Sequence, residues 1–296
     1  MPERLYIIGN GFDRFHGVPS GYDQFGNYVR RVDRRLADLA EEFLPSPPDE
    51  TLWSRFEENL AYMDSDQLVD VASDFLMSPG DDNWRDSANH DYQFEIEQTV
   101  GSLSSGLKAH FNDWLGTLII PTAADYQGTR VSLAPEARYL SFNYTSTLTQ
   151  LYAIPETRIL NIHGKVGAAL KDIVLGHGRS PVATPASPDD ADEDFRILEG
   201  RKIVEDYFRK TFKPARQILE RNKAFFDQLV DVNEIYVLGH ALSEVDAVYL
   251  QAIADAAPNA DWRVSYYETP VELAVRMEAL KIPWWRVSYE PMGRFL

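Results

Sequence analysis

The stretch LYIIGNGFDRFHGVP (5–19) joins an apolar run to polar side chains that could do chemistry. Gly9 and Gly11 follow the run, and Asp13 and His16 come directly after them. An apolar strand that ends in glycines and continues into a helix is typical of the first loop of a Rossmann-type sheet, because glycine lets the backbone approach a phosphate or a ribose closely. The full G-x-G-x-x-G spacing is absent, since an arginine stands in place of the third glycine. The loop indicates nucleotide binding, with a simple chain turn as the alternative.

Polar residues follow several other apolar runs in the same way. In open parallel sheets the carboxyl ends of the strands line the ligand crevice, so residues at these ends are candidates for one site. Any one of them alone could be a hydrogen-bonded structural residue. Their coincidence, with four of the six histidines in the chain lying next to a glycine, favours a shared site. The residues in question are Asn143, His163, His177, His240, Ser243 and Asp246.

Some familiar chemistries fail against these residues. The segment GHALS (239–243) has alanine where the G-x-S-x-G nucleophile of a serine hydrolase would stand, and no phosphate-cradling G-x-x-x-x-G-K-[ST] pattern occurs. A metallohydrolase stays open, although no tight ligand spacing such as H-x-x-x-H is present. Its divalent ion would activate water and would be held by Asp13, His163, His177, His240 and Asp246.

Composition narrows the class of protein. The 296 residues carry a formal net charge of −17, which repels phosphate backbones and makes nucleic acid an unlikely partner, although YVRRVDRR (28–35) is a local basic cluster. The chain contains no cysteine, which excludes disulfides, thiolate metal sites and cysteine nucleophiles. Neither a signal peptide nor a long apolar span is visible, so we expect a soluble cytoplasmic protein without a membrane partner.

The elements that must position the polar residues read as an α/β fold. Short apolar runs without polar alternation predict strands covered on both faces, and therefore a mainly parallel sheet. Helical periodicity follows at 243–257, where Ser243 can cap the helix, and at 269–281. The alternation predicts a Rossmann-like, doubly wound sheet. The predicted strands are 4–9, 137–142, 157–162, 172–176, 234–239, 262–267 and 284–289.

Two stretches depart from the strand and helix alternation. Residues 28–120 show helical periodicity at 51–63 and 94–119, and residues 195–231 read as one or two amphipathic helices. The segment 179–194 is rich in proline and aspartate and predicts an exposed loop. We expect a single α/β domain over 1–296 that carries a helical insertion at 28–120 and a loop and helix insertion at 179–231.

The motifs in their order resemble the bacterial AbiH family, which is linked to abortive infection during phage attack. The resemblance rests on IIGNGFDRFHGVP (7–19), Trp53 with Phe56 and Glu57, SFNYTSTL (141–148), NIHGKV (161–166), LGHG (175–178) and YVLGHALSEVD (236–246). AbiH proteins in turn resemble, more distantly, the SIR2-like fold, which binds NAD in a Rossmann-type sheet. The absence of a four-cysteine zinc module counts against sirtuin-like deacetylation.

The resemblance implies roles for individual residues. Asn143 matches the strand-end asparagine of SIR2-like proteins and would orient water or a ribose hydroxyl, while His163 matches their catalytic histidine and would take a proton. Asp13 would stabilise positive charge on the ribose or orient His16. The remaining residues would contact the nucleotide: Gly9, Asn10, Gly11, Phe12, His16, His177, Gly239, His240, Ser243 and Asp246.

From the resemblance and the strand-end cluster we expect an anti-phage effector that hydrolyses NAD, its substrate, at the nicotinamide–ribose bond. A His/Asp metal-dependent phosphoesterase or nuclease and a noncatalytic nucleotide sensor stay as alternatives. We expect a nucleotide ligand, with a phage-derived trigger or partner protein and a homo-oligomer as further possibilities.

Overall fold

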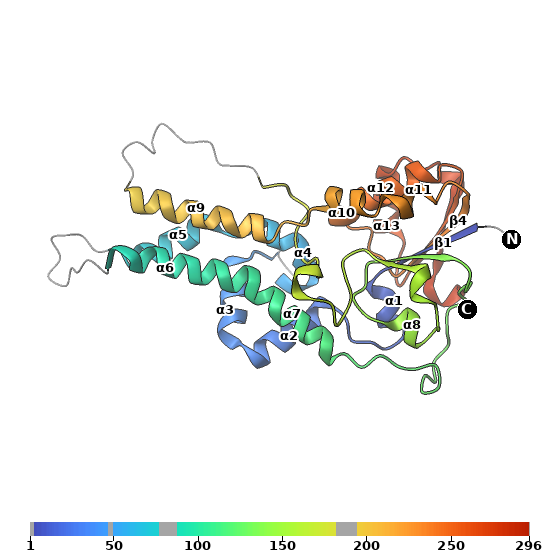
Figure 1. The fold of residues 1–296 in the computed structure, drawn as a ribbon, viewed down its shortest axis with the longest axis horizontal. Coiled ribbons are helices and arrows are strands. Elements are labelled where there is room, and N and C mark those ends of the chain that lie inside the picture. Colours follow the sequence, from blue (N-terminus) through green and yellow to red (C-terminus); the bar gives the residue numbers. More distant parts are fainter. Residues whose placement is uncertain (1–2, 47–49, 77–87, 182–193, 296) are drawn as a thin grey trace. The chain divides into compact units, whose positions relative to one another are not determined.

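The computed structural model describes residues 3–46, 50–76, 88–181 and 194–295 (Figure 1). The chain divides into two compact units. The first, which we call the sheet unit, consists of 1–21, 112–174 and 214–296. The second, the helical unit, consists of 22–111 and 175–213. The boundaries of the helical unit differ from those of the two expected insertions, because 112–120 and 214–231 belong to the sheet unit.

The sheet unit is built on six parallel strands in its described residues, in the order β3-β2-β1-β4-β5-β6. This is the doubly wound order of a Rossmann-type sheet, in which the chain changes direction of winding between β1 and β4. The predicted α/β class is confirmed. The strands are β1 (Glu3–Ile8), β2 (Arg138–Ser141), β3 (Ile159–Asn161), β4 (Val232–Leu238), β5 (Asp261–Tyr266) and β6 (Val287–Pro291).

One face of the sheet packs against a continuous apolar core. Leu5 and Ile7 of β1, Ile235 and Val237 of β4, and Trp262 of β5 point into it. Burial on both faces explains why these strands read as apolar runs without alternation. The helices that contribute to this core are α10 (Ala215–Arg221), α11 (Lys223–Asp227), α12 (Ala247–Ala256) and α13 (Val271–Ala279).

The other face carries a second core with a stack of tyrosines. Tyr6 lies between Tyr139 and Tyr236, at 5.1 and 4.8 Å between ring centroids. Phe12 of α1 (Asn10–Phe15) and Leu148 of α8 (Thr147–Gln150) belong to this core. The two faces therefore differ in their helices, since α10 to α13 contribute to the first core and α1 and α8 to the second.

One predicted strand is wrong. The run DIVLG (172–176) forms no strand: Leu170–Asp172 is a 3-10 turn, and Val174 donates one backbone hydrogen bond to His163 O at 2.9 Å. The chain turns away from the sheet here, and Gly176, at φ +157°, packs against the carbonyl of Thr211. The strand-end cluster therefore draws on four strands instead of five. The other six predicted strands are present, within a few residues of their expected bounds.

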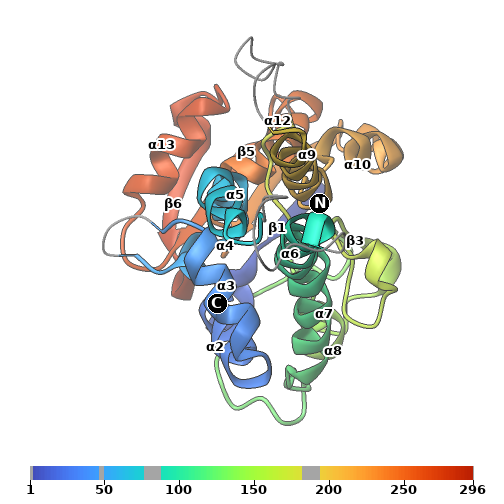
Figure 2. The ribbon, with the colours of Figure 1, turned by 90° about the vertical axis from the view of Figure 1, so that its left-hand side faces the viewer.

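The helical unit packs around aromatic side chains. The ring of Phe25 meets Trp53, Phe56 and Phe111 edge to face, and all four side chains are buried. Helices α6 and α9 lie along each other (Figures 1 and 2). The α-helices that begin here are α2 (Tyr22–Val32), α3 (Arg34–Phe43), α4 (Phe56–Asn59), α5 (Ser65–Ser73), α6 (Ala88–Gly101), α7 (Leu107–Thr117) and α9 (Phe195–Lys210).

Aspartate side chains start three of these helices. Asp33, Asp64 and Asp194 accept the backbone N–H of Leu36, Gln67 and Arg196, at 2.9 to 3.0 Å. Each bond satisfies one of the donors that a helix leaves free at its first turn. The expected loop at 179–194 falls mostly on residues outside the described ranges. Among the described residues, no helix combines the length and the apolar character that crossing a bilayer needs.

Candidate functional site

Polar residues gather where β1, β2, β3 and β4 end, all within the sheet unit. More than nine-tenths of each side chain in this group is withdrawn from solvent. The group consists of Asp13, Asn143, His163, His240 and Asp246. Burial of this many polar groups is costly unless each finds a partner, so their contacts decide what the edge can do.

Asp13 is the carboxylate beside the first loop. It is 1% exposed, and its Oδ2 accepts a hydrogen bond from Thr145 Oγ1 at 2.6 Å. Oδ1 has no hydrogen-bond partner within the described residues, nor does an arginine, lysine or histidine there form an ion pair with this carboxylate. Burial raises the pKa of Asp13 to about 6, although hydrogen bonding from Thr145, Thr147 and Asn143 opposes the shift.

Asn143 links the second strand end to the first. Its Nδ2 donates to the carbonyl of Gly9 at 3.0 Å, and its backbone N–H donates to Ser141 Oγ at 3.2 Å. These contacts fix the carboxamide next to the Asp13 carboxylate. Asp13 and Asn143, both expected to be catalytic, therefore lie next to each other at this edge of the sheet.

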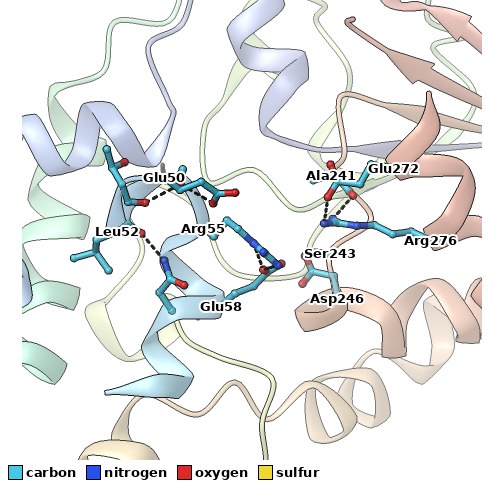
Figure 3. Close-up of polar contacts among 12 residues, drawn as sticks. Glu50, Leu52, Arg55, Glu58, Ala241, Ser243, Asp246, Glu272 and Arg276 are labelled. Carbon is cyan, nitrogen blue, oxygen red and sulfur yellow. Dashed lines mark hydrogen bonds and ion pairs between the residues drawn. The ribbon is translucent and has the colours of Figure 1, made fainter. Parts of the chain in front are cut away.

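Asp246 lies between two histidines. Its Oδ1 is 3.5 Å from His163 Nε2, and its Oδ2 is 3.5 Å from His240 Nε2. Ser243 Oγ donates to Oδ2 at 3.2 Å, so the hydroxyl expected to cap a helix binds this carboxylate instead (Figure 3). The ring of Phe142 packs edge to face against both imidazoles.

The tautomer of His240 follows from a backbone contact. Leu242 N–H donates to His240 Nδ1 at 2.9 Å, so this nitrogen carries no proton. The neutral ring must hold its proton on Nε2, which faces Asp246. Leu242 itself has φ +54°, a strained conformation for a branched residue, and Arg276 holds the same loop by donating to Ala241 O at 2.6 Å (Figure 3).

The glycines of the first loop allow the loops after β1 and β4 to contact each other closely. A Cβ on Gly9 would lie 2.4 Å from the Cα of His240, and a Cβ on Gly239 would lie 2.0 Å from the backbone nitrogen of Phe12. Gly11 N donates to Gly239 O at 2.8 Å. The loops after β1 and β4 therefore touch at the point where the winding changes, and only glycine permits this approach. Asn10, Gly11, Gly239 and Ser243 are the half-exposed part of this edge.

Both ring nitrogens of His16 form hydrogen bonds within the protein. Nδ1 donates to the carbonyl of Phe12 at 2.7 Å, and Nε2 accepts from the Tyr152 hydroxyl at 2.6 Å, which in turn accepts from Val131 N–H at 3.0 Å. Burial lowers the pKa of His16, so the ring is neutral. It closes the end of α1, and Asp13 is not its partner.

His177 belongs to the helical unit. Its backbone pairs with Thr211 and Lys213, and its ring lies beside Phe208 and Phe212. Burial lowers its pKa to about 4. Within the described residues neither ring nitrogen has a hydrogen bond that meets normal geometry.

Two residues at the edge were missed by the sequence reasoning. Thr145, the donor to Asp13, lies two residues after Asn143, and its hydroxyl so close to a strand end is the signal in the sequence that points to it. Tyr267 follows β5, and its hydroxyl donates to the carbonyl of Gly11. About half of the Tyr267 side chain is exposed. It was read as part of a strand, and nothing in its sequence context points to the first loop.

The residues do not gather as a metal site. Among the described residues, no group of three or more histidine and acidic side chains is arranged to hold an ion. Asp246 is nearest to such an arrangement, but its carboxylate oxygens contact the two histidines directly, each 3.5 Å from the facing Nε2.

The fold and the edge together define a Rossmann-type α/β protein with a polar cluster at its topological switch point. The family model described as "Bacteriophage abortive infection AbiH" matches residues 5–266, so the chain belongs to the AbiH family, and its role is in abortive infection. The match covers every residue of the strand-end cluster. No curated protein and no solved structure matches the chain.

Proposed function

We propose that this chain is a cytoplasmic nucleotide hydrolase of the abortive-infection response, and that it cleaves the nicotinamide–ribose bond of NAD with water. The observation that carries the proposal is Asp13, a buried carboxylate at the switch point of the sheet that pairs with no cation among the described residues. A fold that needs only stability does not favour such a group, because an uncompensated buried charge is destabilising.

The chemistry of the bond explains why such a carboxylate is useful. When the bond between C1′ and the nicotinamide nitrogen breaks, its electron pair leaves with nicotinamide and positive charge builds on the ribose. A fixed negative group in a water-poor site stabilises that charge more than water does. With a pKa of about 6, Asp13 is mostly ionised at neutral pH.

Asn143 and His163 supply the acceptor side of the reaction. The Asn143 carboxamide is fixed beside Asp13 and orients the attacking water or a ribose hydroxyl. His163 takes a proton from the attacking water as the new C1′–O bond forms, and Asp246 stabilises the imidazolium that results. The products are nicotinamide, ADP-ribose and a proton.

The test is nicotinamide release by the purified full chain, with chelator present in a parallel sample. The proposal predicts release that survives chelator and is lost in Asn143→Ala. The matched control is Asn222→Ala, which removes an amide bonded to Ile218 O between α10 and α11 and should leave release unchanged. Saturable NAD binding without product would overturn the proposal in favour of a sensor, and loss of turnover with chelator would overturn it in favour of a metal-dependent enzyme.

A further inference from the structure

A cavity of about 230 Å³ opens on the tyrosine face of the sheet unit. Strand alternation puts Arg4, Tyr6, Tyr236 and Arg263 on this face, because Leu5, Ile235 and Trp262 point to the other one. Helices α10, α11, α12 and α13 contribute to the opposite core. Besides these strand residues, the cavity is lined by 132–134, Glu290, Arg294 and Phe295.

Arginines dominate the charge of this cavity. Arg4, Arg263 and Arg294 line it together with one acid, Glu290, and a second acid, Glu234, lies beside them. Three guanidinium groups against two carboxylates give local positive charge on a chain whose net charge is −17. Positive charge concentrated in a hollow of an acidic protein favours an anionic ligand.

Two of the guanidinium groups are held in place from behind. Arg4 Nε donates to Glu234 Oε2 at 2.6 Å, and Arg263 lies 3.9 Å from the same carboxylate. Both lie over the ring of Tyr236, at 5.9 and 5.6 Å from its centroid. The tyrosine stack on the sheet thus fixes their positions before any ligand arrives, which lowers the entropy cost of binding.

The donors needed for an anion are not used up within the protein. No hydrogen bond joins the guanidinium of Arg263 or Arg294 to another described residue, and for Arg4 the bond to Glu234 uses Nε alone. The Arg4 and Arg263 side chains are 34% and 48% exposed, so a ligand can reach them. Planar forked guanidinium groups match phosphate oxygens in pairs.

The geometry points to a binding site for a phosphate-bearing anion on this face, formed by Arg4, Arg263 and Arg294. The cavity is smaller than the roughly 300–1,000 Å³ of pockets for drug-sized ligands, so orthophosphate, pyrophosphate or the phosphate end of a small metabolite is the ligand class. Both faces of the Tyr6 ring are covered by the neighbouring tyrosines. This inference is independent of the proposed hydrolase, because it uses none of the strand-end residues.

The test is calorimetric titration of the full chain with orthophosphate, pyrophosphate and ribose 5-phosphate at constant ionic strength. We expect one saturable site for at least one probe, and at least a tenfold weaker affinity in Arg263→Gln/Arg294→Gln. A free anion is the source if orthophosphate or pyrophosphate binds tightest, and a phosphorylated metabolite is the source if ribose 5-phosphate does.

The control is Arg158→Gln/Arg216→Gln, which changes the net charge equally at exposed positions of the same unit. It should keep the wild-type affinity. A second variant, Arg263→Lys/Arg294→Lys, keeps the charge and guards against misfolding; it should bind, with reduced affinity. Absence of saturable binding to all three probes, or equal weakening in the control, would overturn the site.

Discussion

Asp13 in the sheet unit and Glu57 in the helical unit are both withdrawn from water, but their surroundings differ. Glu57 pairs with the fully buried Lys213 at 3.0 Å, and its Oε1 also accepts the backbone N–H of Gly176. Asp13 accepts a hydrogen bond from Thr145 on Oδ2, whereas its Oδ1 has no hydrogen-bond partner and the carboxylate pairs with no cation among the described residues. A buried carboxylate with a complete set of partners is what a fold requires, whereas a carboxylate left incomplete is stabilised only by what binds to it.

The comparison separates residues by what their loss should affect. Residues of the strand-end cluster should matter for turnover more than for folding, and the Glu57–Lys213 pair should matter for folding. The following substitutions test that separation.

The largest effect is expected on turnover when the proposed base is removed. His163→Gln should lower NAD hydrolysis by about 10²–10⁴-fold, because general base catalysis contributes on that order. His110→Gln changes a partly exposed histidine of the helical unit and is the matched control. Nicotinamide release by both variants measures the effect, and equal activity in the two would remove His163 from the mechanism.

The next largest effect is on stability in the helical unit. Lys213→Met leaves Glu57 buried without its cation and should lower the free energy of unfolding by about 3–5 kcal/mol. The double variant Glu57→Gln/Lys213→Met should recover most of that loss. Urea unfolding measures both, and a single variant as stable as the wild type would show that the pair is not a structural requirement.

A smaller effect of opposite sign is expected at Asp13. Its folded-state pKa is about 6 against an unfolded value near 3.8, so ionisation destabilises the folded state by roughly 3 kcal/mol once the pH exceeds 6. Asp13→Asn should therefore stabilise the chain at pH 7.5 by up to that amount, while turnover falls. The gain should shrink between pH 6 and pH 4. Unfolding curves at pH 7.5, 5 and 4 measure it, and a gain that is the same at every pH would contradict the assigned ionisation.

The smallest effect is expected at His16. His16→Gln disrupts the contacts with Phe12 and Tyr152 and should cost about 1–2 kcal/mol, since a net hydrogen bond contributes roughly 1 kcal/mol. Turnover per folded molecule should stay unchanged. A large loss of turnover with intact stability would return His16 to the site.

Most of the sheet could be predicted from the sequence, because strands that are buried on both faces consist of uninterrupted apolar runs. The sequence also predicted that Asn143, His163 and His240 would meet at one edge, because parallel strands end on the same side. DIVLG (172–176) misled for the same reason, since a short apolar run carries no information on whether a neighbouring strand is available to pair with it.

Contacts between segments that are distant in the chain could not be predicted from the sequence. Nothing local to Gly9 and Gly239 tells that the loops after β1 and β4 touch, or that Asp246 would lie between two histidines. Lys213 was missed because a lysine in an aromatic segment reads as a surface residue until its partner, 156 residues away, is seen.

The most direct test of the account is the level of NAD, nicotinamide and ADP-ribose in phage-challenged cells, measured by mass spectrometry. Cells would express the wild type, Asn143→Ala or Asn222→Ala, so that infection supplies any trigger that the purified protein lacks. We expect NAD to fall, with both products rising, in cells that carry the wild type or Asn222→Ala and not in those that carry Asn143→Ala. Unchanged NAD in cells that the wild type protects from phage would contradict the account.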